Sequence, residues 1–131
     1  MKVIDVEKTP WKITVGRLTL NVIQTLNLNL PEKDIVIWHD RVSHFRKHRN
    51  RYSTEAQFEE CINSIPDVIA NPDYVALHPS TGSIEYIKMI NILFIVAVRL
   101  RTSGDLNVRS AYPLTNKQLS DYIASGTAKK M

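Results

Sequence analysis

Two histidines four residues apart, His44 and His48, are the side chains of this sequence best suited to chemistry near neutral pH. Imidazole titrates near neutrality, so it can accept or donate a proton during a reaction. In a helix, residues at i and i+4 share one face, which would bring the two rings together. The spacing also matches the two ligands of a zinc-protease helix, but Phe45 stands where that motif needs its glutamate. We therefore favour acid–base chemistry over a metal site, and two histidines on a solvated helix are the alternative.

The histidines lie in a strongly basic stretch of the chain. Between residues 39 and 52 a single acid, Asp40, accompanies five cations, which are Arg41, Arg46, Lys47, Arg49 and Arg51. The formal net charge of the whole chain is +4, so the positive excess is concentrated here. Such a cluster attracts anions, nucleic acid among them. We expect Arg41, Lys47 and Arg51 to contact the phosphates of a substrate.

A second group of candidate residues lies in the segment 109–112, which reads Arg-Ser-Ala-Tyr. Side chains alternate along a strand, so we expect Arg109 to share a face with Ala111, and Ser110 to share the other face with Tyr112. The serine and tyrosine would hydrogen-bond a phosphate or a ribose, and the arginine would stabilise phosphate charge. The alternative is an ordinary strand with its tyrosine in the core. Lys88 is a further candidate phosphate contact, although an exposed lysine is the commoner explanation.

Several catalytic motifs are absent from the sequence. It has no Walker A motif, no GxGxxG, no GxSxG elbow, no paired cysteines and no compact cluster of acids for two-metal chemistry. Cleavage of a phosphodiester would then use a nucleophile of the substrate, and RNA supplies one in its 2′-hydroxyl. A base removes that proton, an acid protonates the leaving 5′-oxygen, and cations stabilise the charged intermediate. We therefore expect no metal and no other cofactor.

Hydrophobic periodicity and turn signals indicate the elements that carry these residues. The first half of the chain predicts a strand over 11–15 ended by Gly16, a helix over 18–28, a strand over 34–38, a basic helix over 40–50 with Asp40 as its N-cap, and a helix capped by Thr54 and Gln57. The second half predicts strands over 74–78, 84–89, 92–100 and 106–112, and a closing helix capped by Thr115 and Gln118. The short connections between these strands favour antiparallel neighbours.

Together the elements predict a single α+β domain over residues 1–131. N-terminal helices would pack on an antiparallel sheet of about four strands, followed by a short C-terminal helix. Residues 126–131 are expected to form a disordered tail. The N-terminus lacks the apolar segment of a secretory signal, and the longest apolar run, 90–98, is too short to span a bilayer. We therefore expect a cytoplasmic protein with no membrane partner.

The order of these motifs resembles the phage-associated branch of the Barnase–EndoU–colicin–RelE (BECR) nuclease superfamily. A β-branched strand precedes the helix of His44 and His48, the next helix runs into the segment 65–74, and the last strand ends in 109–112. The resemblance covers residues 15–123. It implies an α+β fold and an RNA substrate, commonly tRNA or mRNA on the ribosome. It also implies a site made by a helix histidine and polar residues of the last strands, which marks His44 most strongly, then His48, Arg109 and Ser110, and more weakly Tyr112 and Lys88.

The resulting expectation is a metal-independent endoribonuclease, a toxin or mobile-element effector, that leaves a 2′,3′-cyclic phosphate. A toxin of this kind would have an immunity or antitoxin protein that covers its basic face. Two alternatives remain. A non-catalytic nucleic-acid-binding module would use the same basic helix through phosphate contacts, and a structural or interaction domain of a phage or mobile element would not bind nucleic acid at moderate salt. The ribonuclease hypothesis requires His44 and the strand at 109–110 to face a common cleft.

Overall fold

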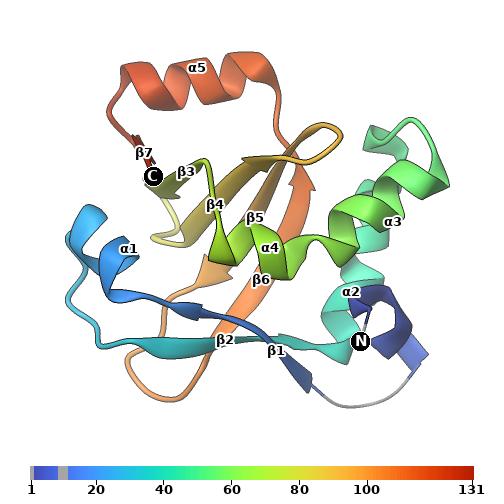
Figure 1. Ribbon diagram of the computed structural model, residues 1–131, viewed down its shortest axis with the longest axis horizontal. Coiled ribbons are helices and arrows are strands. Elements are labelled where there is room, and N and C mark those ends of the chain that lie inside the picture. The colour runs from blue at the N-terminus through green and yellow to red at the C-terminus, as the bar shows by residue number, and fades with distance from the viewer. Residues whose placement is uncertain (1, 9–11) are drawn as a thin grey trace.

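One mixed β-sheet with α-helices on both faces organises the chain (Figure 1). The structure is a computed structural model, and it describes residues 2–8 and 12–131. In chain order the elements are the 3₁₀ helix η1 (Val3–Lys8), β1 (Lys12–Leu18), α1 (Leu20–Thr25), β2 (Lys33–Trp38), α2 (His39–Phe45), the 3₁₀ helix η2 (Arg46–Arg51), α3 (Glu55–Asn63), α4 (Ile65–Ala70), β3 (Tyr74–Leu77), β4 (Ile84–Met89), β5 (Leu93–Arg99), β6 (Leu106–Pro113), α5 (Asn116–Ala124) and β7 (Ala128–Lys130). None of the described helices is long and apolar enough to cross a membrane.

The sheet is larger than the sequence predicts. Within the described residues it has seven strands, in the order β1-β2-β6-β5-β4-β3-β7. The antiparallel run from β3 to β6 is present as expected. The expectation of about four antiparallel strands with the helices at the N-terminus is wrong, because β1 and β2 extend the sheet, β2 runs parallel to β6, and the α-helices are interspersed among the strands. Periodicity finds a strand, but the backbone groups that pair it with a distant strand leave no mark in the sequence.

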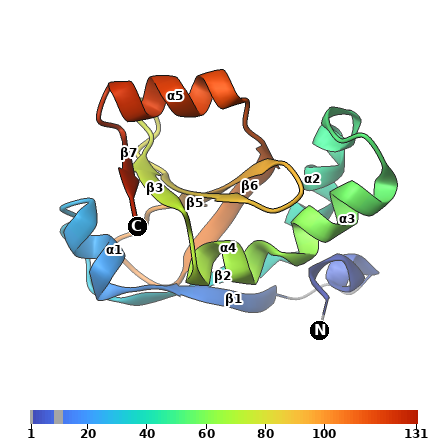
Figure 2. The same cartoon turned by 45° about the horizontal axis from the view of Figure 1, so that its top comes forward.

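The structure has an ordered strand within the segment 126–131, where a disordered tail was expected. Ala128–Lys130 forms β7, which pairs antiparallel with β3 and lies beside it in Figure 2. Ala128 is buried. The free edge of β3 presents unpaired N–H and C=O groups, and the end of the chain satisfies them.

The first strand differs from its prediction at Gly16. A strand over 11–15 ended by this glycine was expected. Trp11 lies outside the described residues, and β1 continues through the glycine to Leu18 with a change of register between Thr14 and Gly16. A Cβ atom at Gly16 would lie 2.6 Å from Cγ2 of Ile69 in α4. The glycine therefore allows α4 to pack directly on β1.

The predicted caps of α3 and α5 are confirmed, but the basic helix differs from its prediction. The Thr54 hydroxyl accepts from the Gln57 amide, and Thr115 and Gln118 form a complete capping box at α5. The predicted helix over 40–50 is instead α2 followed by the 3₁₀ helix η2. Asp40 is not its N-cap, because α2 starts one residue earlier, directly where β2 ends.

Two apolar clusters lie on opposite faces of the sheet. Helices α2, α3 and α4 cover one face. The largest buried side chains of the cluster on this face include Phe45, Phe58 and Phe94. Helix α5 lies on the other face, where Leu119 and Tyr122 pack against a smaller cluster around Ile87 and Ile95. Figure 2 shows α5 and α4 on opposite sides of the strands. Helix α5 thus covers only part of its face.

Candidate active site

A cleft of about 460 Å³ opens on the α5 face of the sheet. It is lined by Arg41, His44, His78, Thr81, Ser83, Glu85, Ala97, Arg109, Ser110 and Tyr112. Its floor is a row of paired residues across three strands, since Glu85 of β4 pairs with Ala97 of β5, which pairs with Ser110 of β6. Alanine and serine are small, so they leave a hollow where larger side chains would fill the face.

A β-bulge brings Arg109 into this cleft. Ala97 pairs with Ser110, whereas the next residue of β5, Val98, pairs with Val108, so Arg109 is an extra residue on β6. A bulge bends its strand and re-aims a side chain. The expected sharing of a face by Arg109 and Ala111 is therefore wrong. Ala111 is fully buried in the core beneath the helices, and Arg109 lines the cleft beside Ser110.

His44 reaches the cleft from α2, at the side of the sheet. Val42 and Phe45 are buried in the core and anchor this short helix. The imidazole of His44 therefore lies at the boundary between the core and solvent. Burial lowers the pKa of His44, the charges of Arg41 and Lys47 lower it further, and Asp40 opposes them. The imidazole is therefore predominantly neutral at pH 7 and can accept a proton.

His48 and Arg51 border the cleft through Tyr112. The His48 ring meets that of His44 edge-on, with 6.2 Å between centroids, and lies 5.5 Å from the ring of Tyr112. The Arg51 guanidinium lies over the same tyrosine at 5.6 Å. Burial lowers the pKa of His48, as do the charges of Arg51 and Lys47. His48 is therefore a neighbour of the cleft and not part of its lining.

Glu85 is a site residue that the sequence did not reveal. Its side chain is 1% exposed, and Oε1 accepts a hydrogen bond of 2.9 Å from the Tyr122 hydroxyl of α5. Burial raises the pKa of Glu85, and the hydrogen bond from Tyr122 opposes this rise. A carboxyl group of this kind keeps its proton to higher pH than an exposed one and can act as an acid. The available signal was a lone acid inside an apolar strand.

His78 is the second residue that the sequence reasoning missed. It was expected to be a loop residue, and it does lie just after β3, but its ring lines the cleft. The backbone N–H groups of Ser80 and Thr81 both donate to Nδ1, each at 3.1 Å. A nitrogen that accepts two hydrogen bonds carries no proton, so the neutral ring holds its proton on Nε2. His78 can therefore donate a hydrogen bond from Nε2.

Two other candidate residues lie outside the cleft. Lys88 is on the opposite face of β4, where Nζ donates to the Asn71 carbonyl oxygen at 2.7 Å and lies 3.8 Å from Asp73. It ties α4 to the start of β3. Lys47 is exposed on η2, and its charge lowers the pKa of His44. Of the nine candidates, the structure brings five together in the cleft: Arg41, His44, Arg109, Ser110 and Tyr112.

Within the part of the chain that the structure describes, no three His, Cys, Asp or Glu side chains are grouped to hold a metal ion. The cleft instead combines two histidines, a buried acid, hydroxyl groups and two arginines above an antiparallel sheet. This combination suits proton transfer beside a phosphate and defines the class of a small α+β nuclease domain.

Comparison with known families agrees with this class. Residues 12–121 match the family described as phage-Barnase-EndoU-ColicinE5/D-RelE like nuclease3. The chain therefore belongs to this family of BECR-like nucleases, which confirms the resemblance seen in the sequence. A comparison with curated proteins and one with solved structures returned no match.

Proposed function

We propose that this protein is a metal-independent endoribonuclease that cleaves RNA through attack of the 2′-hydroxyl and leaves a 2′,3′-cyclic phosphate. The observation that carries the proposal is the convergence of His44, Glu85 and Arg109 on one cleft. A base, an acid and a cation are the three groups that this transesterification needs.

His44 is the general base of the proposed reaction. Its lowered pKa leaves the imidazole unprotonated at pH 7, so it can take the proton of the 2′-hydroxyl as the O2′–P bond forms. Glu85, whose pKa is raised, gives its proton to the 5′-oxygen as the P–O5′ bond breaks. One proton is taken and one is given, so the charge on the protein pair is conserved.

Hydrogen-bond donors on two sides of the cleft stabilise the negative charge that develops on the phosphate. Arg109 and Arg41 lie together, since Nη1 of Arg41 donates to the carbonyl oxygen of Arg109 at 3.3 Å. Guanidinium groups bind phosphate through two parallel hydrogen bonds. The Nε2–H group of His78 and the hydroxyl of Ser110 are further donors toward the non-bridging oxygens. Donors fixed in advance stabilise the transition state because they need no reorganisation.

The test is cleavage of RNA in excess EDTA by the wild type, His44→Ala and Arg109→Ala, with Arg17→Ala as the matched arginine control. Arg17 lies on β1 in an exposed ion pair with Asp34 at 2.8 Å. We expect the wild type to cleave and to leave cyclic phosphate ends. Loss of a general base should reduce the rate about 10²- to 10⁴-fold, and loss of one charge-stabilising donor roughly 10²- to 10³-fold. Arg17→Ala should cleave at the wild-type rate.

Three outcomes would contradict the proposal. Cleavage that stops in EDTA would indicate a metal-dependent reaction. Equal cleavage of DNA of the same sequence would exclude the 2′-hydroxyl as nucleophile. Binding of RNA without cleavage at any pH would indicate a non-catalytic binding module.

A further inference from the structure

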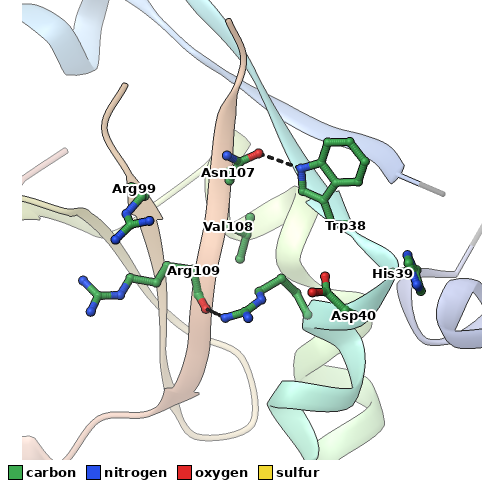
Figure 3. Close-up of a pocket in the computed structure, with 8 residues that line it drawn as sticks. Trp38, His39, Asp40, Arg99, Asn107, Val108 and Arg109 are labelled. Carbon is green, nitrogen blue, oxygen red and sulfur yellow. Dashed lines mark hydrogen bonds between the residues drawn. The ribbon is translucent and has the colours of Figure 1, made fainter. Parts of the chain in front are cut away.

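A second cleft adjoins the candidate active cleft. It has a volume of about 410 Å³, and Arg41 and Arg109 line both clefts, so the two are neighbours. Figure 3 shows Trp38 and Asn107 along one side of it and the guanidinium groups of Arg99 and Arg109 along the other. Its volume lies within the range of small-molecule sites.

Trp38 is exposed and yet fixed in position. Its side chain is 43% exposed at the end of β2, and the indole N–H donates to Oδ1 of Asn107 at 2.9 Å. This contact is possible because β2 runs parallel to β6, with Val36 opposite Asn107. A large aromatic ring held in this way loses little conformational freedom when a flat ligand stacks on it. Nucleic-acid bases are such ligands, because every base has a π-face.

The walls of this cleft carry more positive than negative charge. Arg41, Arg99 and Arg109 line it together with one acid, Asp40. Among the residues that the structure describes, no ion pair joins Arg99 or Arg109 to a carboxylate. Cations without a protein partner are available to a phosphate group.

Lys12 adds a further cation beside the ring. Its Nζ lies 5.1 Å from the centroid of Trp38 and 3.6 Å from Asp105. The side chain is 47% exposed, and an exposed pair of this type is weak. Lys12 can therefore move aside when a base stacks on the indole, and it stays within reach of the phosphate.

We propose that this second cleft binds the nucleotide next to the scissile phosphate, with its base stacked on Trp38 and its own phosphate on Arg99. Arg109 and Arg41 lie between the two clefts, so they are shared by the scissile phosphate and its neighbour. This subsite rests on the proposed ribonuclease function for the identity of the adjoining site. The binding itself does not require cleavage, which allows the two proposals to be tested separately.

The test is the binding of a short 2′-O-methyl RNA oligonucleotide, which lacks the nucleophile and so cannot be cleaved. The sequence has two tryptophans, so Trp11→Phe leaves Trp38 as the only indole. We expect saturable quenching of its fluorescence. In wild-type protein, the NMR signal of the Trp38 indole N–H should shift with the same affinity, which guards against a folding defect in the Trp11 variant.

Arginine variants test the phosphate contact. Arg99→Ala should weaken binding roughly tenfold and lower the salt slope of log K by about 1, as expected for one phosphate contact. The matched control is Arg101→Ala, because Arg101 is exposed two residues along the chain and lies at a different surface hollow. It removes the same charge but should change the affinity less than twofold.

Several results would overturn the subsite. These are no binding of the oligonucleotide, binding with unchanged Trp38 fluorescence and NMR signal, and equal weakening by Arg99→Ala and Arg101→Ala. If the wild type fails to cleave RNA but the oligonucleotide quenches Trp38 and depends on Arg99, the ribonuclease proposal fails and the subsite stands. If RNA is cleaved and the Trp38 signals do not change, the subsite proposal fails and the ribonuclease proposal stands.

Discussion

The two faces of the sheet are built by the same strands and differ sharply in chemistry. On the face covered by α2, α3 and α4, strands β4 and β5 present Ile84, Tyr86 and Val96, all with no exposed surface. The residues that alternate with them on the other face include Glu85 and Ala97, which form the floor of the cleft. One face excludes water and supplies stability. The other retains a buried acid and neighbouring cations, which cost stability and make chemistry possible.

A second contrast divides the cleft face itself. Helix α5 covers the half around Ile87 and Ile95 and leaves the half around Ser110 open. The two halves are linked by the hydrogen bond from Tyr122 of α5 to Glu85. Helix α5 therefore holds the acid of the cleft in position.

The largest expected difference between the faces is in stability. Phe94→Ala removes a fully buried ring from the helix-covered face, so the free energy of unfolding should fall by about 3–5 kcal/mol. Met89→Ala is the control, because Met89 is exposed, and its effect should stay within about 0.5 kcal/mol. Urea unfolding followed by circular dichroism measures both. A loss below about 1 kcal/mol for Phe94→Ala would show that the helix-covered face is loosely packed.

A smaller difference is expected when atoms are added to each face. In Gly16→Ala the new Cβ would lie 2.6 Å from Ile69 Cγ2, and overpacking of this kind costs about 1–3 kcal/mol. Ala97→Val adds two methyl groups to the cleft floor, where there is room, so stability should change by about 0.5 kcal/mol or less.

The same pair of variants separates stability from activity. Ala97→Val should lower the rate of RNA cleavage, because its methyl groups occupy the space of the phosphate. The ratio of activity loss to stability loss is therefore high on the cleft face and low on the helix-covered face. Equal ratios for the two variants would remove the contrast between the faces.

The smallest effect concerns the pH dependence of stability. The pKa of Glu85 is raised in the folded state by burial. Between its unfolded and folded pKa values the folded state binds more protons than the unfolded state, so the free energy of unfolding falls as pH rises. Glu85→Gln removes this group and should abolish that decline. The stability of Glu85→Gln relative to wild type should therefore be lowest in acid and increase as pH rises through the folded pKa of Glu85.

Urea unfolding of both proteins over a series of pH values measures this difference. A stability difference that stays constant with pH would mean that Glu85 titrates normally, and its role as an acid would then lose its support. Tyr122→Phe is a useful companion, because it removes the hydrogen bond that opposes the raised pKa. It should move the pH range of the decline upward.

Local signals in the sequence predicted much of the fold. The capping box of Thr115 and Gln118 fixed the start of α5, because its two hydrogen bonds lie within four residues. The strands from β3 to β6 were predictable because their connections are short. The pairing of β2 with β6 and of β7 with β3 was not, because strands far apart in the chain pair through backbone groups that all residues share.

The candidate site divides in the same way. His44 and Arg109 could be selected from the sequence, because an imidazole in a basic stretch and an arginine on a strand carry their chemistry wherever they lie. Glu85 and His78 could not, because a buried acid and a fixed tautomer depend on neighbours. Lys88 lies away from the cleft, because alternation along β4 places it on the face opposite Glu85.

The sequence by itself determined the types of chemical group, the helix caps, the strands of the central run and the family. The tertiary structure alone decided which groups meet. Arg41 and Arg109 are 68 residues apart and share a hydrogen bond, and a bulge that no local pattern marks places Arg109 in the lining of the cleft that His44 also lines. The physical reason is that side-chain chemistry is a property of single residues. A cleft, by contrast, and the pKa values within it, arise from burial and from charges on distant elements.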